Sequence, residues 1–436
     1  MSIVLQNALL VDIDPPRVER GALRIGGSQI VQRGARVASQ PGDDVVDCGG
    51  AVVMPGLVNG HTHLYSALAV GVPPPSPAPT NFLEILQRVW WRLDRAHDAE
   101  SIQLSAQVGA LDALRCGTTT LIDHHASPGM IEGSLELIEQ AVGAVGLRGV
   151  LCYETTDRNG RPGGRLGLAE NRRFLARCAQ RRDGRFAGLV GAHAAFTLED
   201  ESLAALADLA REFDTGVHIH VAEDPVDDAT CRAQFHAPLI DRLARHGLLR
   251  PANVFAHGTH LDAEATARIN EAGLTIAHNP RSNMNNAVGY APIERFHGPV
   301  MLGTDGIGGD MLTEAKLAWL KARDARIDIT PRDVLAMLAV AARRASAALG
   351  VTVGRLAVGA AADVVITDYS APTPLTADNL AGHFIFGLGP QYVRDVLIGG
   401  RWVMRQRVVQ TCDEPVSRRA AVGVAEKLWQ RMGSLP

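Results

Sequence analysis

The chain lacks an excess of charge of either sign, because 43 Lys and Arg residues face 47 Asp and Glu residues and leave a formal net charge of −4. This balance gives no electrostatic reason to expect a nucleic acid or an anionic membrane as a partner. No apolar run approaches the roughly 20 residues of a membrane-spanning helix, and the first residues lack the pattern of a signal peptide. We therefore expect a soluble, cytoplasmic protein that binds neither nucleic acid nor membrane.

Cysteine is scarce, and no two cysteines form a CxxC pair. In a chain of 436 residues this indicates reduced thiols in the cytosol and not a disulfide framework. A glycine-rich phosphate loop ending in Lys-Ser or Lys-Thr is also missing, so nothing indicates binding of a nucleoside triphosphate. The six cysteines are Cys48, Cys116, Cys152, Cys178, Cys231 and Cys412.

What the chain does contain is an alternation of short apolar strands with helical stretches, which predicts an α/β protein with a parallel sheet. The simplest account is a TIM-like (β/α)8 barrel over residues 57–353. Strand-like segments at both chain ends predict a small β-sandwich, to which residues 1–56 contribute one part and residues 354–414 the other. Residues 415–436 have helical spacing and predict a C-terminal helix. The length of 436 residues suffices for one large domain and a smaller one.

Eight apolar segments are the candidate barrel strands, and histidines gather at their ends. The active site of such a barrel lies at the C-terminal ends of the strands. Nine of the 15 histidines fall there, which favours a functional role over packing. The residues at these ends are His61 and His63, His124 and His125, Cys152 and Glu154, His193, His218 and His220 with Glu223, His257, His278 and Asp305.

His61 and His63 form an HxH pair after the first of these segments. Residues two apart on a strand project the same way, so both imidazoles can reach one metal ion at about 2.0–2.1 Å. Alone, the pair is weak evidence, since surface or packed histidines produce the same spacing. It gains weight because other strand ends offer further ligands.

The segments that carry these residues resemble the amidohydrolase superfamily, in particular its cytosine-deaminase-like and chlorohydrolase-like branch. The matching stretches are MPGLVNGHTH, VHIHVAE, FAHG, IAHNPRSN and LGTDG. A closer resemblance, to aminohydrolases of the SsnA type, rests on VWWRLDRAHDAES, LIDHHASP, GLRGVLCYETTDRN and AEKLWQRM. That subgroup narrows the fold and the metal more than the substrate.

The resemblance implies one divalent metal ion, Zn²⁺ or alternatively Fe²⁺. Three nitrogen ligands and one carboxylate, with a water completing the site, are typical of a catalytic metal centre. No lysine ends the fourth strand candidate, where a binuclear member of the superfamily carries a bridging carbamate, so one metal is expected. The implied ligands are His61, His63, His220 and Asp305.

The resemblance also implies the catalytic roles. Asp305 would accept a proton from the metal-bound water, and Glu223 would carry a proton to a ring nitrogen of the substrate. His257 would orient the attacking hydroxide or stabilise the tetrahedral centre. His218 is expected to support the site or to pack, since His220 is the ligand of that pair. The expected substrate contacts are His193, His125, Trp91 and Asn283, with a packing role as the alternative for His193 and support of Asp305 as the alternative for Asn283.

A proline-rich stretch over residues 71–80 leads into Trp90 and Trp91. It predicts a lid over the mouth of the barrel. The alternative is a docking surface between subunits, which would make the protein a homodimer.

The expected activity is hydrolysis of a small nitrogen heterocycle, in which metal-bound hydroxide attacks an amidine-like ring carbon and ammonia leaves. The same residues would serve to expel chloride, an alkylamine or the sulfide of a thiohydantoin-like ring, or to hydrolyse a cyclic amide, and the sequence does not separate these reactions. A non-catalytic binding protein is the rival from another class. The complete ligand set together with Glu223 and His257 argues against it.

Overall fold

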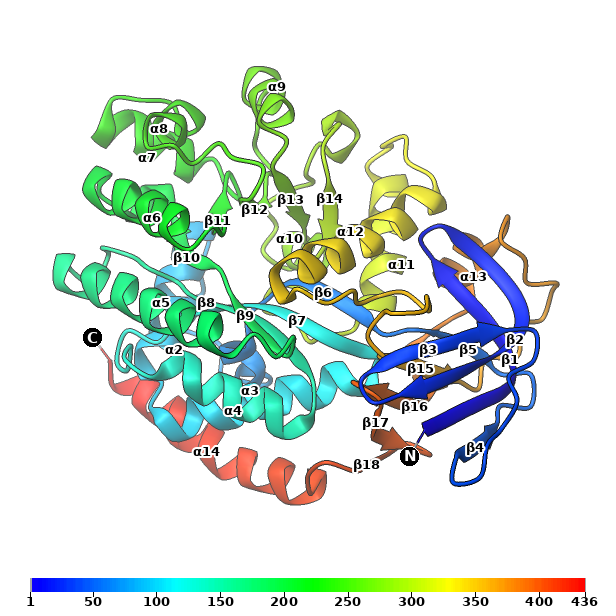
Figure 1. The fold of residues 1–436 in the computed structure, drawn as a ribbon. Coiled ribbons are helices and arrows are strands. Elements are labelled where there is room, and N and C mark those ends of the chain that lie inside the picture. Colours follow the sequence, from blue (N-terminus) through cyan, green and yellow to red (C-terminus); the bar gives the residue numbers. More distant parts are fainter. Residues whose placement is uncertain (1, 436) are drawn as a thin grey trace.

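Two parallel β-sheets occupy the middle of the chain in the computed structural model, which describes residues 2–435 (Figure 1). Their strands are buried along their whole length, which explains why the segments are apolar without alternation. The first sheet holds β6 (Leu57–Thr62), β7 (Thr118–His125), β8 (Arg148–Tyr153) and β9 (Phe186–Gly188). The second holds β10 (Val190–Ala194), β11 (Val217–Val221), β12 (Val254–His257), β13 (Thr275–His278) and β14 (Val300–Leu302).

Backbone contacts join the edges of these two sheets. A single residue, Leu189, separates β9 from β10, and a parallel bridge pairs Thr155 with Ala192. At the other seam Thr62 pairs with Asp305, just beyond β14. β9, Leu189 and β10 therefore form one extended run that passes from the first sheet to the second.

Strands from the two chain ends pair in a third, mixed sheet of nine strands. The junction is an antiparallel pairing of β5 with β15, in which Val53 lies opposite Ile366. These strands are β1 (Ser2–Ile13), β2 (Pro16–Gly26), β3 (Gln29–Gly34), β4 (Asp44–Asp47), β5 (Val52–Pro55), β15 (Val364–Thr367), β16 (Val393–Ile398), β17 (Arg401–Arg405) and β18 (Val408–Val409).

The first strand candidate of the sequence divides between two sheets at Gly56. Residues before it form β5 in the terminal sheet, and residues after it form β6 in the parallel sheet. A Cβ atom at position 56 would lie 2.2 Å from Oγ1 of Thr119. Only glycine therefore lets the chain pass β7 so closely.

Helices follow the parallel strands and cover their outer side (Figure 1). Asp98 caps α3 through a capping box, and Gly117, at φ +78°, follows its end. The helices are α1 (Phe82–Ile85), α2 (Trp91–Ala96), α3 (Ala99–Arg115), α4 (Ser134–Val145), α5 (Arg161–Arg181), α6 (Asp200–Glu212), α7 (Val226–Phe235), α8 (Leu239–Arg245), α9 (Ala263–Ala272), α10 (Pro280–Asn285), α11 (Met311–Asp324), α12 (Pro331–Leu349), α13 (Leu380–Phe386) and α14 (Glu414–Ser434). Among the described residues, none of these helices combines the length and apolar character that crossing a bilayer requires.

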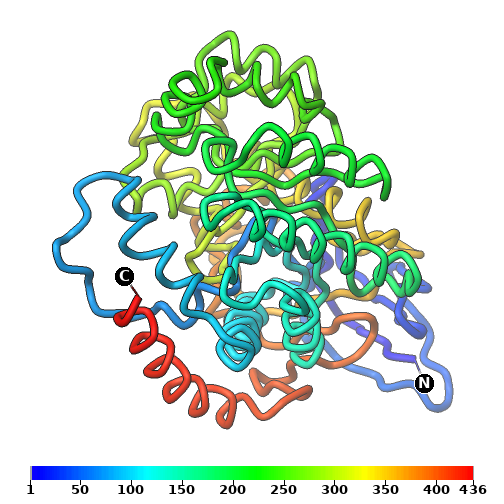
Figure 2. The backbone as a smooth tube through the Cα atoms, turned by 90° about the vertical axis from the view of Figure 1, so that its left-hand side faces the viewer, coloured from blue at the N-terminus to red at the C-terminus, as the bar shows by residue number. Residues whose placement is uncertain are grey.

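Helix α14 runs back along α2 and α3, beside the segment that precedes them (Figure 2). Val424, Leu428 and Met432 recur every fourth residue and are buried against Leu68 and Leu93. The indole Nε1 of Trp429 donates to the carbonyl of Leu68 at 2.8 Å. The C-terminal helix thereby holds the segment that leads from β6 toward Trp90 and Trp91.

A buried ion pair links the first parallel sheet to the terminal sheet. Nε and Nη2 of Arg148, on β8, donate to the two carboxylate oxygens of Asp363 at 2.7 and 2.9 Å. Asp363 is 1% exposed and also accepts from the backbone N–H of Gly399 at 2.8 Å. Nη1 of Arg148 donates to the carbonyl of Gly184 at 2.6 Å.

We predict that Asp363→Ala lowers the free energy of unfolding by about 3–5 kcal/mol, because it leaves the Arg148 guanidinium buried without its counter-charge. Denaturant unfolding followed by circular dichroism measures the change. Glu212→Ala is the matched control, since Glu212 pairs with Arg172 on the surface, with side chains 48% and 50% exposed, and its loss should cost less than about 1 kcal/mol. Equal effects of the two variants would contradict the prediction.

Candidate active site

Four side chains from three strand ends converge at the C-terminal edge of the parallel strands. His61 and His63 come from the end of β6 and the residue after it, His220 from β11, and Asp305 from the turn after β14. One ligand atom from each lies within 4.8 Å of the others. Nε2 of His63 lies 2.8 Å from Oδ1 of Asp305 and 3.2 Å from Nε2 of His220, and Nε2 of His61 lies 3.4 Å from the same Asp305 oxygen.

The other ring nitrogen of each histidine is fixed by a neighbouring strand. Nδ1 of His63 donates to the carbonyl of His124 at 2.5 Å, and Nδ1 of His220 donates to the carbonyl of His193 at 2.8 Å. A carbonyl oxygen only accepts, so Nδ1 of each of these two rings carries a proton, and a neutral ring can then offer its Nε2 lone pair to a metal ion. Nδ1 of His61 pairs with Nε2 of His218 at 2.9 Å.

These donors fit a divalent cation. Two imidazole lone pairs repel each other at 3.2 Å unless a positive charge lies between them, and Nε2 of His61 is buried without a hydrogen-bond partner. Three imidazole nitrogens and one carboxylate oxygen, each nitrogen oriented through its opposite N–H, make the donor set of a catalytic zinc or iron site. Two further groups, His63–His124–Glu154 and Glu223–His257–Asp305, each share one residue with this cluster.

The Asp305 carboxylate is held from several sides. Its backbone N–H donates to the carbonyl of His61 at 2.9 Å, and Oδ2 accepts from the hydroxyl of Ser282. Burial opposes ionisation of Asp305, but the contacts with His61 and His63 outweigh it and hold the pKa of this carboxyl well below its usual range. Asp305 and His257 have positive φ values of 53° and 74°. Such backbone strain in residues other than glycine is concentrated at functional sites.

Glu223 and His257 lie beside this cluster. Oε2 of Glu223 is 3.4 Å from Nε2 of His257, and Oε1 accepts from the amide of Asn286 at 3.2 Å. Burial raises the pKa of Glu223 to about 7, although His257 opposes the shift. Nδ1 of His257 donates to Oδ1 of Asn283 at 2.8 Å, which leaves the lone pair of His257 on Nε2.

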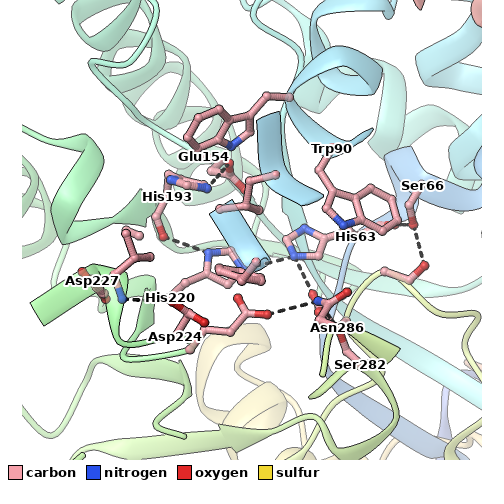
Figure 3. A pocket seen from close by; sticks show the side chains of 18 of the residues that line it. His63, Ser66, Trp90, Glu154, His193, His220, Asp224, Asp227, Ser282 and Asn286 are labelled. Atoms are coloured by element: carbon pink, nitrogen blue, oxygen red, sulfur yellow. Dashed lines mark hydrogen bonds and ion pairs between the residues drawn. The ribbon is translucent and has the colours of Figure 1, made fainter. Parts of the chain in front are cut away.

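The cluster forms the base of a pocket of about 770 Å³ that opens to solvent (Figure 3). Its walls combine aromatic side chains with acidic and amide groups. Trp90 and Trp91, from the segment after the proline-rich stretch, are among the lining residues. The aromatic lining residues are Tyr65, Phe82, Trp90, Trp91 and Phe196, and the polar ones include Glu154, Arg158, His193, Glu223, Asp224 and Asn286.

The expected substrate contacts divide into two groups. His193 and Trp91 line the pocket. His125 does not: its neighbour His124 faces the metal-ligand cluster, and strand alternation turns His125 to the other side, where Nε2 pairs with the hydroxyl of Ser127 at 2.9 Å. Asn283 does not line the pocket either, because its side chain orients His257.

A polar network on the pocket wall was missed by sequence reasoning. Arg158 pairs with the buried Asp94, stacks over Trp91 at 4.9 Å and lies 3.8 Å from Glu154. Glu154 in turn contacts His124 at 3.2 Å and His193 at 3.7 Å. Burial opposes ionisation of Glu154, but the two histidines outweigh it and lower its pKa well below the usual range. Only the position of Glu154 at a strand end signalled this network in advance.

Comparison with known proteins agrees with the geometry of the site. The sequence profile of the amidohydrolase family matches residues 52–403. A 5'-deoxyadenosine deaminase of Methanosarcina mazei is 29% identical over 99% of both chains. A 5-methylthioadenosine/S-adenosylhomocysteine deaminase of Nitratidesulfovibrio vulgaris is 31% identical over 91% of this chain and 90% of its own length.

Solved structures show the same fold. An adenosine deaminase from Xanthomonas campestris with bound zinc superposes with a TM-score of 0.84 over 99% of both chains, at 24% identity. An atrazine chlorohydrolase from Arthrobacter aurescens complexed with zinc and atraton gives a TM-score of 0.83 over 97% of this chain and 100% of its own, at 21% identity. At these identities the likeness is one of fold.

We predict that His220→Ala weakens zinc binding by more than ~100-fold, because loss of a mere supporting contact to a metal ligand already costs about 10–100-fold. Competition with a fluorescent zinc chelator measures the affinity. His297→Ala, which removes an exposed histidine, is the control and should bind zinc as the wild type does. Unchanged zinc affinity in His220→Ala would refute the ligand assignment.

Proposed function

Because the chain belongs to the amidohydrolase family, we propose that it deaminates a small nitrogen heterocycle by metal-dependent hydrolysis of a carbon–nitrogen bond. The observation that carries the proposal is the convergence of His61, His63, His220 and Asp305, with Glu223 beside them, at the base of an aromatic pocket. The named relatives that align over nearly the whole chain are deaminases of adenosine-type compounds. A purine-like or nucleoside-like ring is therefore the favoured substrate class.

The proposed metal is a single Zn²⁺, with Fe²⁺ as the alternative, held by His61, His63, His220 and Asp305. A divalent ion at this position would supply a water that loses a proton near neutral pH. The carbonyls of His124 and His193 keep two of the imidazoles oriented for this task. Zinc in the Xanthomonas campestris neighbour supports the choice of metal.

The residues around the cluster can manage the protons of the reaction. Hydrolytic deamination adds water to an amidine-like carbon, protonates the adjacent ring nitrogen and releases ammonia. Glu223, with a pKa raised to about 7 by burial, can hold a proton and deliver it to that nitrogen at neutral pH. His257 presents a lone pair at Nε2 that can accept a hydrogen of the attacking water and orient it. Asp305 would accept the proton that such a water loses, and the remaining hydroxyl proton would go to the amino group that leaves as ammonia.

We also propose that the two parallel sheets form one closed (β/α)8 barrel over residues 57–353. The bridges Thr155–Ala192 and Thr62–Asp305 at the two seams support closure. For residues 1–56 and 354–414 we propose a sandwich, supported by the antiparallel bridge between Gln29 and Ala361, which brings β3 against the chain before β15. Residues 415–436 are proposed as the C-terminal helix of this division, supported by α14 (Glu414–Ser434); residue 436 lies outside the described residues.

The segment that carries Trp90 and Trp91 is proposed as a lid, supported by the position of both indoles on the pocket wall. The homodimer that this segment could otherwise mediate stays a prediction. A cytoplasmic location also stays a prediction, supported by six cysteines that are all free.

A turnover screen tests the reaction. Purified, zinc-loaded protein is incubated with aminated, chlorinated and thio-substituted heterocycles, and ammonia, chloride and sulfide are measured separately. Ammonia release from an amino-substituted purine or nucleoside is the expected result. Release of chloride or sulfide without ammonia would show that the enzyme is not a deaminase. The same residues would then catalyse hydrolytic removal of chloride or sulfide from the ring.

We predict that Glu223→Gln leaves the zinc content near one per chain, because the amide is nearly isosteric with the carboxylate and Glu223 is not a ligand. The turnover rate should fall by ~10²–10⁴, the usual contribution of a positioned general acid or base. Metal analysis and steady-state kinetics on the same preparation measure both quantities. Near wild-type turnover would overturn the proposed role, and loss of zinc would make Glu223 part of the metal site.

A further inference from the structure

The pocket wall above the metal-ligand cluster carries two hydrogen-bond acceptors that the proposed chemistry does not use. Glu154 follows β8, and His193 belongs to β10. Both side chains line the pocket, where Figure 3 shows them pointing toward each other above His220. Oε1 of Glu154 lies 3.7 Å from Nε2 of His193.

The tautomer of His193 follows from its neighbours. The hydroxyl of Thr197 donates to the carbonyl of Ala194 at 3.0 Å, so its oxygen can only accept from Nδ1 of His193, 2.8 Å away. The proton of the neutral ring therefore sits on Nδ1. Nε2 of His193 presents its lone pair to the pocket.

One oxygen of Glu154 is engaged and the other is free. Nε2 of His124 donates to the carbonyl of His218 at 3.0 Å, and Nδ1 of His124 lies 3.2 Å from Oε2 of Glu154. A second proton must lie between these last two atoms, whichever of them holds it, because two lone pairs would otherwise face each other. Within residues 2–435, Oε1 of Glu154 makes no hydrogen bond of its own.

Two acceptors side by side on a buried wall call for two donors from a ligand. Glu154 is 3% exposed and His193 is 7% exposed, so little water reaches them. Arg158 does not fill the need: its Nη2 pairs with Asp94, and its Nη1, which has no hydrogen-bond partner among the described residues, stays 3.8 Å from Oε1 of Glu154, beyond hydrogen-bond distance. The rings of Trp91 and Phe196 each contact the ring of His193 in an edge-to-face arrangement at a centroid distance of 5.9 Å.

We infer that Oε1 of Glu154 and Nε2 of His193 form a recognition subsite for two adjacent hydrogen-bond donors of the substrate, either a ring N–H beside an exocyclic amino group or a vicinal diol. This inference rests on the proposed function, because it gives the substrate's orientation in that same pocket. The donor edge would lie against the wall while the reacting carbon faces Glu223 and the metal ligands. Substrates without such an edge would bind weakly.

Equilibrium binding to the zinc-loaded enzyme tests the subsite with two matched ligand pairs. Guanine and hypoxanthine differ by an amino group beside a ring N–H, and inosine and 2',3'-dideoxyinosine differ by a vicinal diol. We expect the donor-bearing member of one pair to bind ~10–100-fold more tightly, the usual effect of a hydrogen bond to a charged acceptor. A difference in affinity within the first pair identifies the amino edge as the bound group. A difference in affinity within the second pair identifies the diol.

Glu154→Gln should reduce that ratio to less than about threefold while the weaker member of the pair binds as before. Glu154→Asp, which keeps the charge, should restore part of the ratio. Glu201→Gln makes the same change on a side chain that is 78% exposed and should leave the ratio unaltered. If Glu154→Gln does not fold or retain zinc, His193→Gln, which removes the other acceptor, takes its place.

Three results would overturn the subsite: no split in either pair for the wild type, an unchanged ratio in the variant, or an equal loss of affinity for both members of the pair. Ammonia is assayed in the same samples. A wild type that distinguishes the ligands but releases no ammonia from any amino-substituted ring would preserve the subsite and refute the deamination. Ammonia release without a difference in affinity within either pair would support the deamination and refute the subsite.

Discussion

The arrangement of this site depends on one constraint: three imidazole lone pairs and a carboxylate meet in a buried space, so every other polar atom of those rings must be satisfied by protein. The carbonyls of His124 and His193 meet that need for His63 and His220. Both carbonyls belong to neighbouring strands, β7 and β10. The spatial order of the strands thus determines the ring orientations, because β7 lies next to β6 and β10 lies next to β11.

His61 meets the constraint differently, since its Nδ1 pairs with the ring of His218 and not with a carbonyl. His218 and His220 are two residues apart on β11 and project to the same side. His220 reaches the cluster, and His218 remains deeper, where it supports His61. Two histidines that look equivalent in the motif VHIHVAE therefore act at successive depths of the same strand.

Much of this could be predicted from the sequence because the signals are local. Strand and helix alternation, the HxH pair and the order of the strand-end motifs depend on neighbours along the chain. The contacts that the sequence does not reveal depend on distant residues. Asn283 turns to His257, 26 residues away, and the Arg158–Asp94 pair joins positions 64 residues apart. No period or spacing encodes such pairings, because they arise only when separate loops pack over the strand ends.

The pocket separates two tasks between its floor and its wall. In the proposed reaction the floor, at the metal-ligand cluster, holds the groups whose protons move: Glu223, His257 and Asp305, two of them on backbone with positive φ. The wall holds Glu154 and His193, which are held in place by contacts with His124 and Thr197 and present lone pairs to the pocket. The fixed acceptors of the wall would then select the substrate ring, and the groups of the floor that exchange protons would carry out the reaction. Relatives with the same floor could then act on different rings through changes in the wall alone.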